Sequence, residues 1–376
     1  MTSTVAGDLG ALPVDAFDGL GRGYGDAAAV ALLADAELAV NRALVAEVVG
    51  ETASGGQLLA ELERQAPETF DEVLRHPFVR SWAVSCLDGG DAGCDPDRAA
   101  AIAAAVAVRA GLAVEIPVGA HDGRIQLPTV GFFAAPAAEV LVCAGPGSFT
   151  LRWPGGRAEV RAGAPRGWYA ARWVTVDGVR LLLEDTDPYR DRLEHAAADR
   201  LDDDAAEGWS AVLAGAWEHL AADAPRQLAG VRAGVRAIVP LAGTPGGATA
   251  RHAFGALGLS RTAGPAATAV TIVHEFQHTK LGAVLDLIDL IPDDVAGERL
   301  RVGWRPDPRP VEAVLQGAYA FLAVADVWRR RAEPDRFRTH RDWTAAAIDT
   351  LTRGDRLTPA GTRFVARMAE TVDGWR

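Results

Sequence analysis

The sequence predicts an α+β protein with a helical N-terminal region (1–111), a β-rich region built as an antiparallel meander (112–200) and a helical, metal-binding C-terminal region (201–376). Three observations support this division. Apolar residues recur at three- and four-residue spacings in the first region, and short β-prone runs alternate with turn signals in the second. In the third region a His-Glu-x-x-His motif lies within a helical pattern.

Helical periodicity extends from Tyr24 to about Gly111, with Gly-Asp and Gly-Gly pairs between the segments. These segments are AAAVALLADAELAVNRALVAEVV, FDEVLRHPFVRSWAVSCL and PDRAAAIAAAVAVRAGL. After Leu112 the pattern changes to the runs AVEIPV, RIQLPTV, EVLVCA, SFTLRW, AEVRA, YAARWVTV and VRLLLE. Turn signals such as Asp177-Gly178 separate these runs, which is typical of antiparallel hairpins.

Helices and two strands are expected in the C-terminal region. A helix over Asp202–Ala222 opens with an acidic triplet, which suits the positive end of a helix dipole. The strand candidates are VRAIVPLAG and Ala253–Ser260, with a Gly/Thr/Pro loop at 243–249 between them, and ERLRVGWRPDPRP predicts a short strand and a proline-bracketed loop. Further helices are expected at 266–281, at 311–330, at 342–351 and from Thr358 onward.

Composition and charge limit the class of protein. Of the 376 residues, 49% are hydrophobic and 23% are charged, which is typical of a globular chain. The formal net charge of −12 repels polyanions and argues against nucleic-acid binding. The N-terminus, MTSTVAGDLGALPVDAF, has neither a basic nor a continuous apolar segment, so neither secretion nor membrane insertion is expected.

The cysteines bear on the cellular compartment. Cys86, Cys94 and Cys143 form an odd set without a Cys-x-x-Cys pair. This pattern argues against a disulfide framework, a cysteine-based zinc site and an iron–sulfur cluster. The sequence therefore predicts a protein of the reduced cytoplasm.

The segment His274-Glu275-Phe276-Gln277-His278 places a His-Glu-x-x-His motif on an expected helix. At about 100° per residue, His274 and His278 lie on one face, one turn apart, so both imidazoles can bind a single metal ion. Glu275 projects to one side, where it can contact a metal-bound water without being a ligand. The helix is apolar nearly all round, which argues against solvated histidines; a pair hydrogen-bonded within the core is the alternative.

A third ligand is needed, and the sequence offers several. The metzincin continuation requires glycine at 281 and histidine at 284, and Leu281 and Val284 exclude it. A gluzincin-like arrangement, and thus a zincin-like domain, takes its third ligand from a later helix. On 311–330, Glu312 is the chemically better ligand and Gln316 the more embedded position, and they form a polar stripe with Tyr319. Other candidates are Asp289, Asp307, Asp326 and a histidine elsewhere.

The run VHEFQHTKLGAVLDL, preceded by RHAFGALGLS and followed by WRPDPRPVEAVLQGAYAFLAV, resembles the HExxH-type 2-oxoglutarate-dependent peptide β-hydroxylases of ribosomal peptide natural-product pathways. The resemblance covers about Arg251–Trp328. It implies that His274 and His278 bind Fe(II), with Glu275 as the acidic member of the motif. It also implies β-hydroxylation of a precursor peptide with 2-oxoglutarate and dioxygen. In relatives the position of Gln316 is often histidine, and the glutamine here departs from that pattern.

The distal carboxylate of 2-oxoglutarate requires a cation, and guanidinium groups suit this task. Arg305 and Arg309 precede the third-ligand helix directly, and Arg251 and Arg261 flank the preceding strand, so all four are candidates. For each of them a surface or structural role is the alternative.

Lys280 and Tyr319 each have two interpretations. Lys280, the sole lysine, projects about 140° from the histidine face, so we expect it to pair with Asp286 or Asp289 rather than bind the cosubstrate. Tyr319 is a candidate catalytic residue or a core ring with its hydroxyl at the edge.

Two other functions stay open. A zinc metallopeptidase would use Glu275 as its general base. A non-catalytic peptide-binding scaffold with a vestigial metal site would explain the absence of an obvious carboxylate ligand. The strand at 253–260 is rich in small residues and could be an edge on which an extended peptide docks, or an internal strand. His252 and His340 have no partner spacing and are expected to be non-catalytic.

Overall fold

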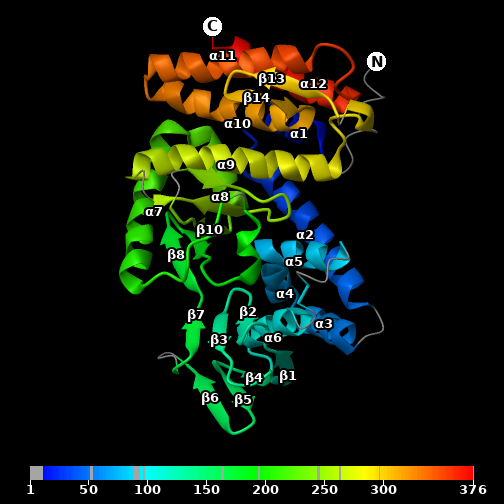
Figure 1. Ribbon diagram of the computed structural model, residues 1–376, viewed down its shortest axis with the longest axis vertical. Helices are drawn as coiled ribbons and strands as arrows, with labels where there is room; N and C mark the ends of the chain where they lie inside the picture. Colours follow the sequence, from blue (N-terminus) through cyan, green and yellow to red (C-terminus); the bar gives the residue numbers. More distant parts are fainter. Residues whose placement is uncertain are drawn as a thin grey trace.

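The elements of the computed structural model follow one long axis, with the C-terminal helices at one end and two antiparallel sheets at the other (Figure 1). The structure describes residues 12–50, 54–88, 94–95, 98–161, 165–193, 195–243, 246–261, 264–295 and 297–375. Its mixture of helices and antiparallel sheets confirms the predicted α+β class.

The expected helices of the N-terminal region are present. They are α1 (Val14–Gly21), α2 (Ala27–Val49), α3 (Ser54–Gln65), α4 (Pro67–Leu74), α5 (Pro77–Leu87) and α6 (Arg98–Ala110). The Asp26 side chain caps α2 by accepting a hydrogen bond from the Ala29 amide at 2.8 Å. Proline starts α4 and α5, where its missing amide hydrogen costs no helical hydrogen bond.

The first seven strands of the β-rich region form two antiparallel sheets. One has the order β1 (Val114–Gly119), β4 (Glu139–Gly145), β5 (Ser148–Trp153) and β6 (Gly156–Val160). The other has the order β2 (Arg124–Leu127), β3 (Gly131–Ala134) and β7 (Trp168–Ala170). The turn at Asp177-Gly178 has φ values of 50° and 77°, as a two-residue hairpin turn with two left-handed positions requires.

A mixed sheet lies beneath the helix that carries the motif. Its order is β11 (Gly247–Ala248), β12 (Ala256–Leu259), β10 (Ala237–Pro240), β9 (Val179–Leu183) and β8 (Arg172–Val176). Strands β9, β10 and β12 are parallel, whereas β11 and β8 are antiparallel edges. The strand expected at 253–260 is therefore internal, and the edge lies within the segment expected to be a loop.

The C-terminal helices are α7 (Asp203–Asp223), α8 (Pro225–Gly234), α9 (Gly264–Leu287), α10 (Val311–Arg330), α11 (Pro334–Leu351) and α12 (Pro359–Asp373). A hairpin of β13 (Arg299–Val302) and β14 (Arg305–Pro310) replaces the expected proline-bracketed loop, and η2 (Pro188–Arg192) and η4 (Asp293–Val295) are short 3₁₀ turns. α9 continues through Gly282, beyond the helix expected at 266–281, because it is held between α7 and α10.

Hydrophobic cores cross the boundaries that the sequence pattern suggested. α1 packs with the C-terminal helices, and the rings of Phe17 and Phe364 meet with their centroids 5.5 Å apart. Strands β8 and β9, from the region expected to end at residue 200, share a core with α7, α8 and α9. α10 has the length and composition of a membrane span, but 72% of its apolar window is buried inside the structure, as in a core helix.

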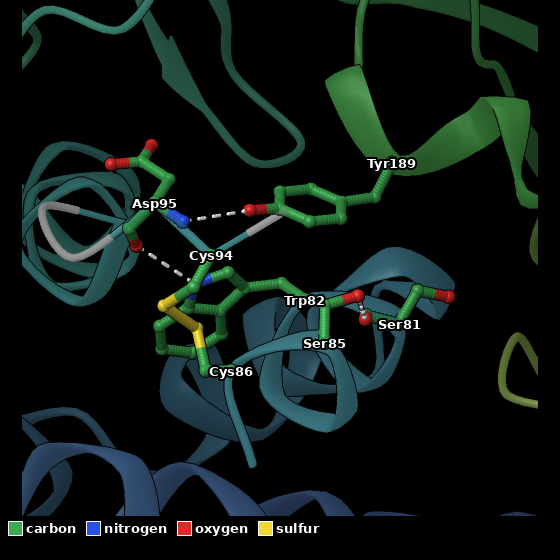
Figure 2. Close-up of a disulfide and its surroundings, with 7 residues drawn as sticks. All are labelled: Ser81, Trp82, Ser85, Cys86, Cys94, Asp95 and Tyr189. Atoms are coloured by element: carbon green, nitrogen blue, oxygen red, sulfur yellow. Dashed lines mark hydrogen bonds between the residues drawn. A yellow bond between two sulfur atoms is a disulfide. The ribbon is translucent and has the colours of Figure 1, made fainter. Parts of the chain in front are cut away.

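A disulfide joins Cys86 and Cys94, which corrects the expectation that the cysteines form none (Figure 2). Next to it, the Trp82 indole donates to the Asp95 carbonyl at 2.9 Å, and the Asp95 amide donates to the Tyr189 hydroxyl at 3.0 Å. An odd number of cysteines does not prevent two of them from pairing, and Cys143 is the one that stays free. The bond ties the end of α5 to the segment before α6.

Removing this disulfide should lower the free energy of unfolding. The cysteines are 8 residues apart, and closing so short a loop is worth roughly 2–3 kcal/mol in a chain-entropy estimate. Urea unfolding of Cys94→Ser should show this loss, whereas Cys143→Ser should unfold like the parent chain. Equal stability of the parent chain with and without reductant would contradict the expectation.

Candidate metal centre

The two motif histidines converge on one point. They lie one turn apart on α9, and their Nε2 atoms are 3.2 Å apart. Two ligands of one ion, each about 2.0–2.1 Å from it, have this separation. Burial lowers the pKa of the His274 ring to about 3, and electrostatic repulsion from the neighbouring His278 and His340 rings adds to this effect. His274 is therefore neutral at physiological pH, as a metal-binding imidazole must be.

Gln316 orients the second histidine. From α10, its side-chain oxygen lies 3.1 Å from Nδ1 of His278, the ring nitrogen that faces away from His274. A hydrogen on Nδ1 that is donated to this oxygen leaves the lone pair of Nε2 free for an ion. In this arrangement Gln316 holds the ligand His278 in place and does not itself bind the ion.

Gln316→Leu should therefore weaken metal binding without abolishing it. Loss of such an orienting partner costs about 10–100-fold in metal affinity. Titration of the metal-free protein with Zn²⁺ against a chelating dye measures the change, and Gln57→Leu on the exposed surface of α3 is the control. Unchanged affinity would show that Gln316 has no part in the centre.

Glu275 is buried, with 6% of its surface exposed, and lies against the edge strand β11. A Cβ atom on Gly247 would come within 2.6 Å of the Glu275 Cγ and 2.8 Å of its Oε1. Glycine at this position thus makes room for the carboxylate beside the strand.

A pocket of about 640 Å³ brings most of the predicted site residues together. Those that line it are Arg251, His274, Glu275, His278, Arg305, Arg309, Glu312 and Gln316. They come from α9, the start of α10, β14 and the segment after β11, which are far apart in sequence. Phe254, Trp304 and Phe321 form an apolar part of the wall.

The third ligand is not fixed by the geometry. In the part of the chain that the structure describes, no third His, Cys, Asp or Glu completes a close group with His274 and His278. Glu312 lines the pocket, is exposed, and has no hydrogen bond or ion pair with the described residues. His195 and Glu37 also line the pocket. Neither residue belongs to a recognisable spacing, so no pattern in the sequence singled them out.

The arginines that line the pocket differ in how many ion-pair and hydrogen-bond partners they have. Among described residues, Arg305 has no hydrogen-bond or ion-pair partner, and Arg309 pairs only with Asp307, at 3.3 Å. Arg251 is held by Asp286 and by the Gly282 carbonyl.

Three further candidates lie outside the pocket's lining. Arg261 lies beside Gly208 of α7 rather than in the pocket. Asp289 and Asp307 do not line the pocket either.

Lys280 and Tyr319 do not reach this pocket. The Lys280 ammonium donates to the Tyr24 carbonyl, rather than pairing with Asp286 or Asp289 as expected, and burial lowers its pKa to about 7. The Tyr319 hydroxyl donates to the Leu20 carbonyl at 2.7 Å in the core. Both side chains thus attach the N-terminal segment to α9 and α10.

Asp326, His252 and His340 do not line the pocket either. Asp326 is buried and forms ion pairs with Arg329 and Arg330. His340, expected to be non-catalytic, donates from Nδ1 to the Arg336 carbonyl and packs among aromatic rings.

A second buried group, His76, Glu184 and Asp187, could hold a metal ion, since its ligand atoms lie within 4.8 Å of one another. Its oxygens already have partners, however. Glu184 accepts His76 Nε2 at 2.8 Å and, on its other oxygen, the Thr186 hydroxyl and amide. The Arg98 guanidinium pairs with Asp187. These contacts form a charge-compensated network that stabilises the junction of α5, α6 and β9.

Comparison of the chain with models of known protein families finds no match, and comparison with curated protein sequences finds none either.

Proposed function

We propose that this protein is a metal-dependent enzyme with a zincin-like catalytic region that hydroxylates a β-carbon of a ribosomally made precursor peptide, using Fe(II), 2-oxoglutarate and dioxygen. The observation that carries the metal site is the convergence of the Nε2 atoms of His274 and His278 at 3.2 Å in the wall of a large pocket. Two imidazoles and one carboxylate, with open positions, are the typical donor set of non-haem Fe(II) oxygenases. Glu312 is the carboxylate that we assign to this set.

Different residues of the pocket would bind the metal ion and the cosubstrate. His274 and His278 would hold the ion, and Gln316 would keep His278 in the ligating tautomer. Fe(II) in this place would supply the activation of dioxygen that hydroxylation requires. Arg305, which has no partner among the described residues, and Arg309 would bind the distal carboxylate of 2-oxoglutarate.

The peptide would lie along β11. This strand is a sheet edge beside Glu275, and an extended chain can add to such an edge by backbone pairing. Phe254, Trp304 and Phe321 give the same pocket an apolar wall for a side chain. A peptide paired with β11 would therefore pass close to the two histidines.

The test begins with the metal-free protein, loaded anaerobically with Fe(II) and 2-oxoglutarate. A weak visible charge-transfer band should form, and air should then give succinate release that depends on a candidate precursor peptide, with a gain of one oxygen in its mass. Arg305→Gln should raise the 2-oxoglutarate concentration needed for the band. Absence of both the band and succinate would remove the hydroxylase proposal.

The position of Glu275 favours a second candidate, a zinc metallopeptidase. Its buried carboxylate lies next to both the histidines and the edge strand, where a general base would deprotonate a water that attacks a bound peptide. Zinc-dependent peptide cleavage that is lost in Glu275→Gln would support it. A scaffold would instead bind peptide equally well after both histidines are replaced.

A further inference from the structure

A second pocket, of about 390 Å³, lies between the α4–α5 junction and the mixed sheet. It shares no lining residue with the pocket at the motif histidines. Four arginines from different elements line it: Arg75 after α4, Arg109 in α6, Arg180 in β9 and Arg236 before β10. Glu72 is the only carboxylate among these described lining residues.

Two of the arginines are partly neutralised. Arg75 donates to the Asp35 carboxylate at 2.7 Å and to the Ala34 carbonyl at 3.0 Å. Arg109 pairs with Glu72 and donates to the Thr129 hydroxyl at 2.9 Å.

The other two form no ion pair with a described carboxylate, although the charges of Glu72 and Asp35 act on Arg236 through space. Within the described ranges, neither Arg180 nor Arg236 makes an ion pair or hydrogen bond through its side chain, and the Arg180 guanidinium lies 4.2 Å from the centre of the Trp173 ring. Both side chains are exposed to solvent. The Arg236 guanidinium is reached by water but has protein atoms on several sides. This partial burial lowers the pKa of Arg236, and the positive charge of Arg75 lowers it further.

The pocket therefore concentrates positive charge in a chain whose net charge is −12. We propose that it binds a small phosphoryl anion, such as a diphosphate group. A single guanidinium group can hydrogen-bond to both oxygens of a carboxylate. A phosphoryl group has more oxygens, so it can bind several guanidinium groups that approach from different elements. The volume accommodates more than one phosphate group.

Calorimetric titration with inorganic diphosphate, in chelator-treated protein at constant ionic strength, tests this site. We expect binding by the parent chain and at least about a tenfold loss of affinity in Arg180→Gln and in Arg236→Gln, since each removes a charge-assisted contact. Arg338→Gln is the control, because Arg338 is an exposed arginine with 63% of its side chain accessible. The exposed positions allow all three variants to fold, which their melting temperatures verify.

Several results would overturn the proposal. Parent-like affinity in both pocket variants would place the anion elsewhere. Equally tight binding of succinate would show a site for dicarboxylates rather than phosphoryl groups. Loss of diphosphate binding in a His274→Ala, His278→Ala double variant would assign the anion to the metal centre, whereas retained binding supports a separate site whatever the fate of the proposed hydroxylase.

Discussion

His274→Ala and His278→Ala should each lower metal affinity by more than about 100-fold and abolish hydroxylation. Loss of an orienting partner alone costs up to about 100-fold, and these variants remove a donor atom itself. The two Nε2 atoms are 3.2 Å apart, so both can bind the same ion. Each variant leaves only one of these two donor atoms. Anaerobic Fe(II) titration, followed by metal analysis after gel filtration, measures the loss.

The His274 and His278 variants need controls for folding and for other metal sites. His121→Ala removes a histidine with 54% of its side chain exposed, in a turn of the β-rich region, and should bind metal like the parent chain. Circular dichroism should be unchanged in all three variants, because both motif histidines face the pocket rather than the core. Full Fe(II) binding by the His274 variant would refute the metal centre.

The sequence indicated which two histidines come together, but few of the residues around them. His274 and His278 could be paired from sequence because helical geometry alone places residues four apart on one face. Gln316 and Glu312 followed from the polar stripe of an apolar helix. His195 had no such signal, because its place at the pocket depends on how a short segment after η2 packs on distant elements.

The errors have a common physical origin in long-range packing. The helical projection predicted correctly that the Lys280 side chain points away from the histidines. Its partner, however, is the Tyr24 carbonyl, 256 residues away in sequence, and no local pattern reports such a contact. The edge strand at Gly247 was missed because it has two residues and no alternating pattern, so that only its pairing with β12 defines it.

Glu184→Gln should destabilise the fold by about 3 kcal/mol at pH 7, because it removes a buried carboxylate that accepts hydrogen bonds from His76 and from the Thr186 amide and hydroxyl. Burial alone would raise the pKa of Glu184. The hydrogen bond and charge of His76, with the hydrogen bonds from Thr186, overcome this effect and lower the pKa from 4.5 to about 2. Urea unfolding of the variant and the parent chain measures the difference.

The sign of the pH dependence follows from this shift. The unfolded chain binds a proton at Glu184 near pH 4.5, whereas the folded protein binds it only near pH 2. The stabilisation by Glu184 is therefore complete above about pH 5 and is lost as the pH falls toward 2. The difference in unfolding free energy between the parent chain and Glu184→Gln should shrink over this range, whereas Glu207→Gln, on the exposed face of α7, should show no such trend.

The same variant distinguishes an ion-pair network from a metal site at His76, Glu184 and Asp187. If the Arg98 guanidinium compensates the carboxylates, dialysis of the parent chain against EDTA should leave its melting temperature unchanged. A metal ion held by the three side chains would stabilise only the folded state, so EDTA would lower the melting temperature. That result would replace the network by a second metal centre, and Glu184→Gln would then lose one equivalent of bound metal as well as stability.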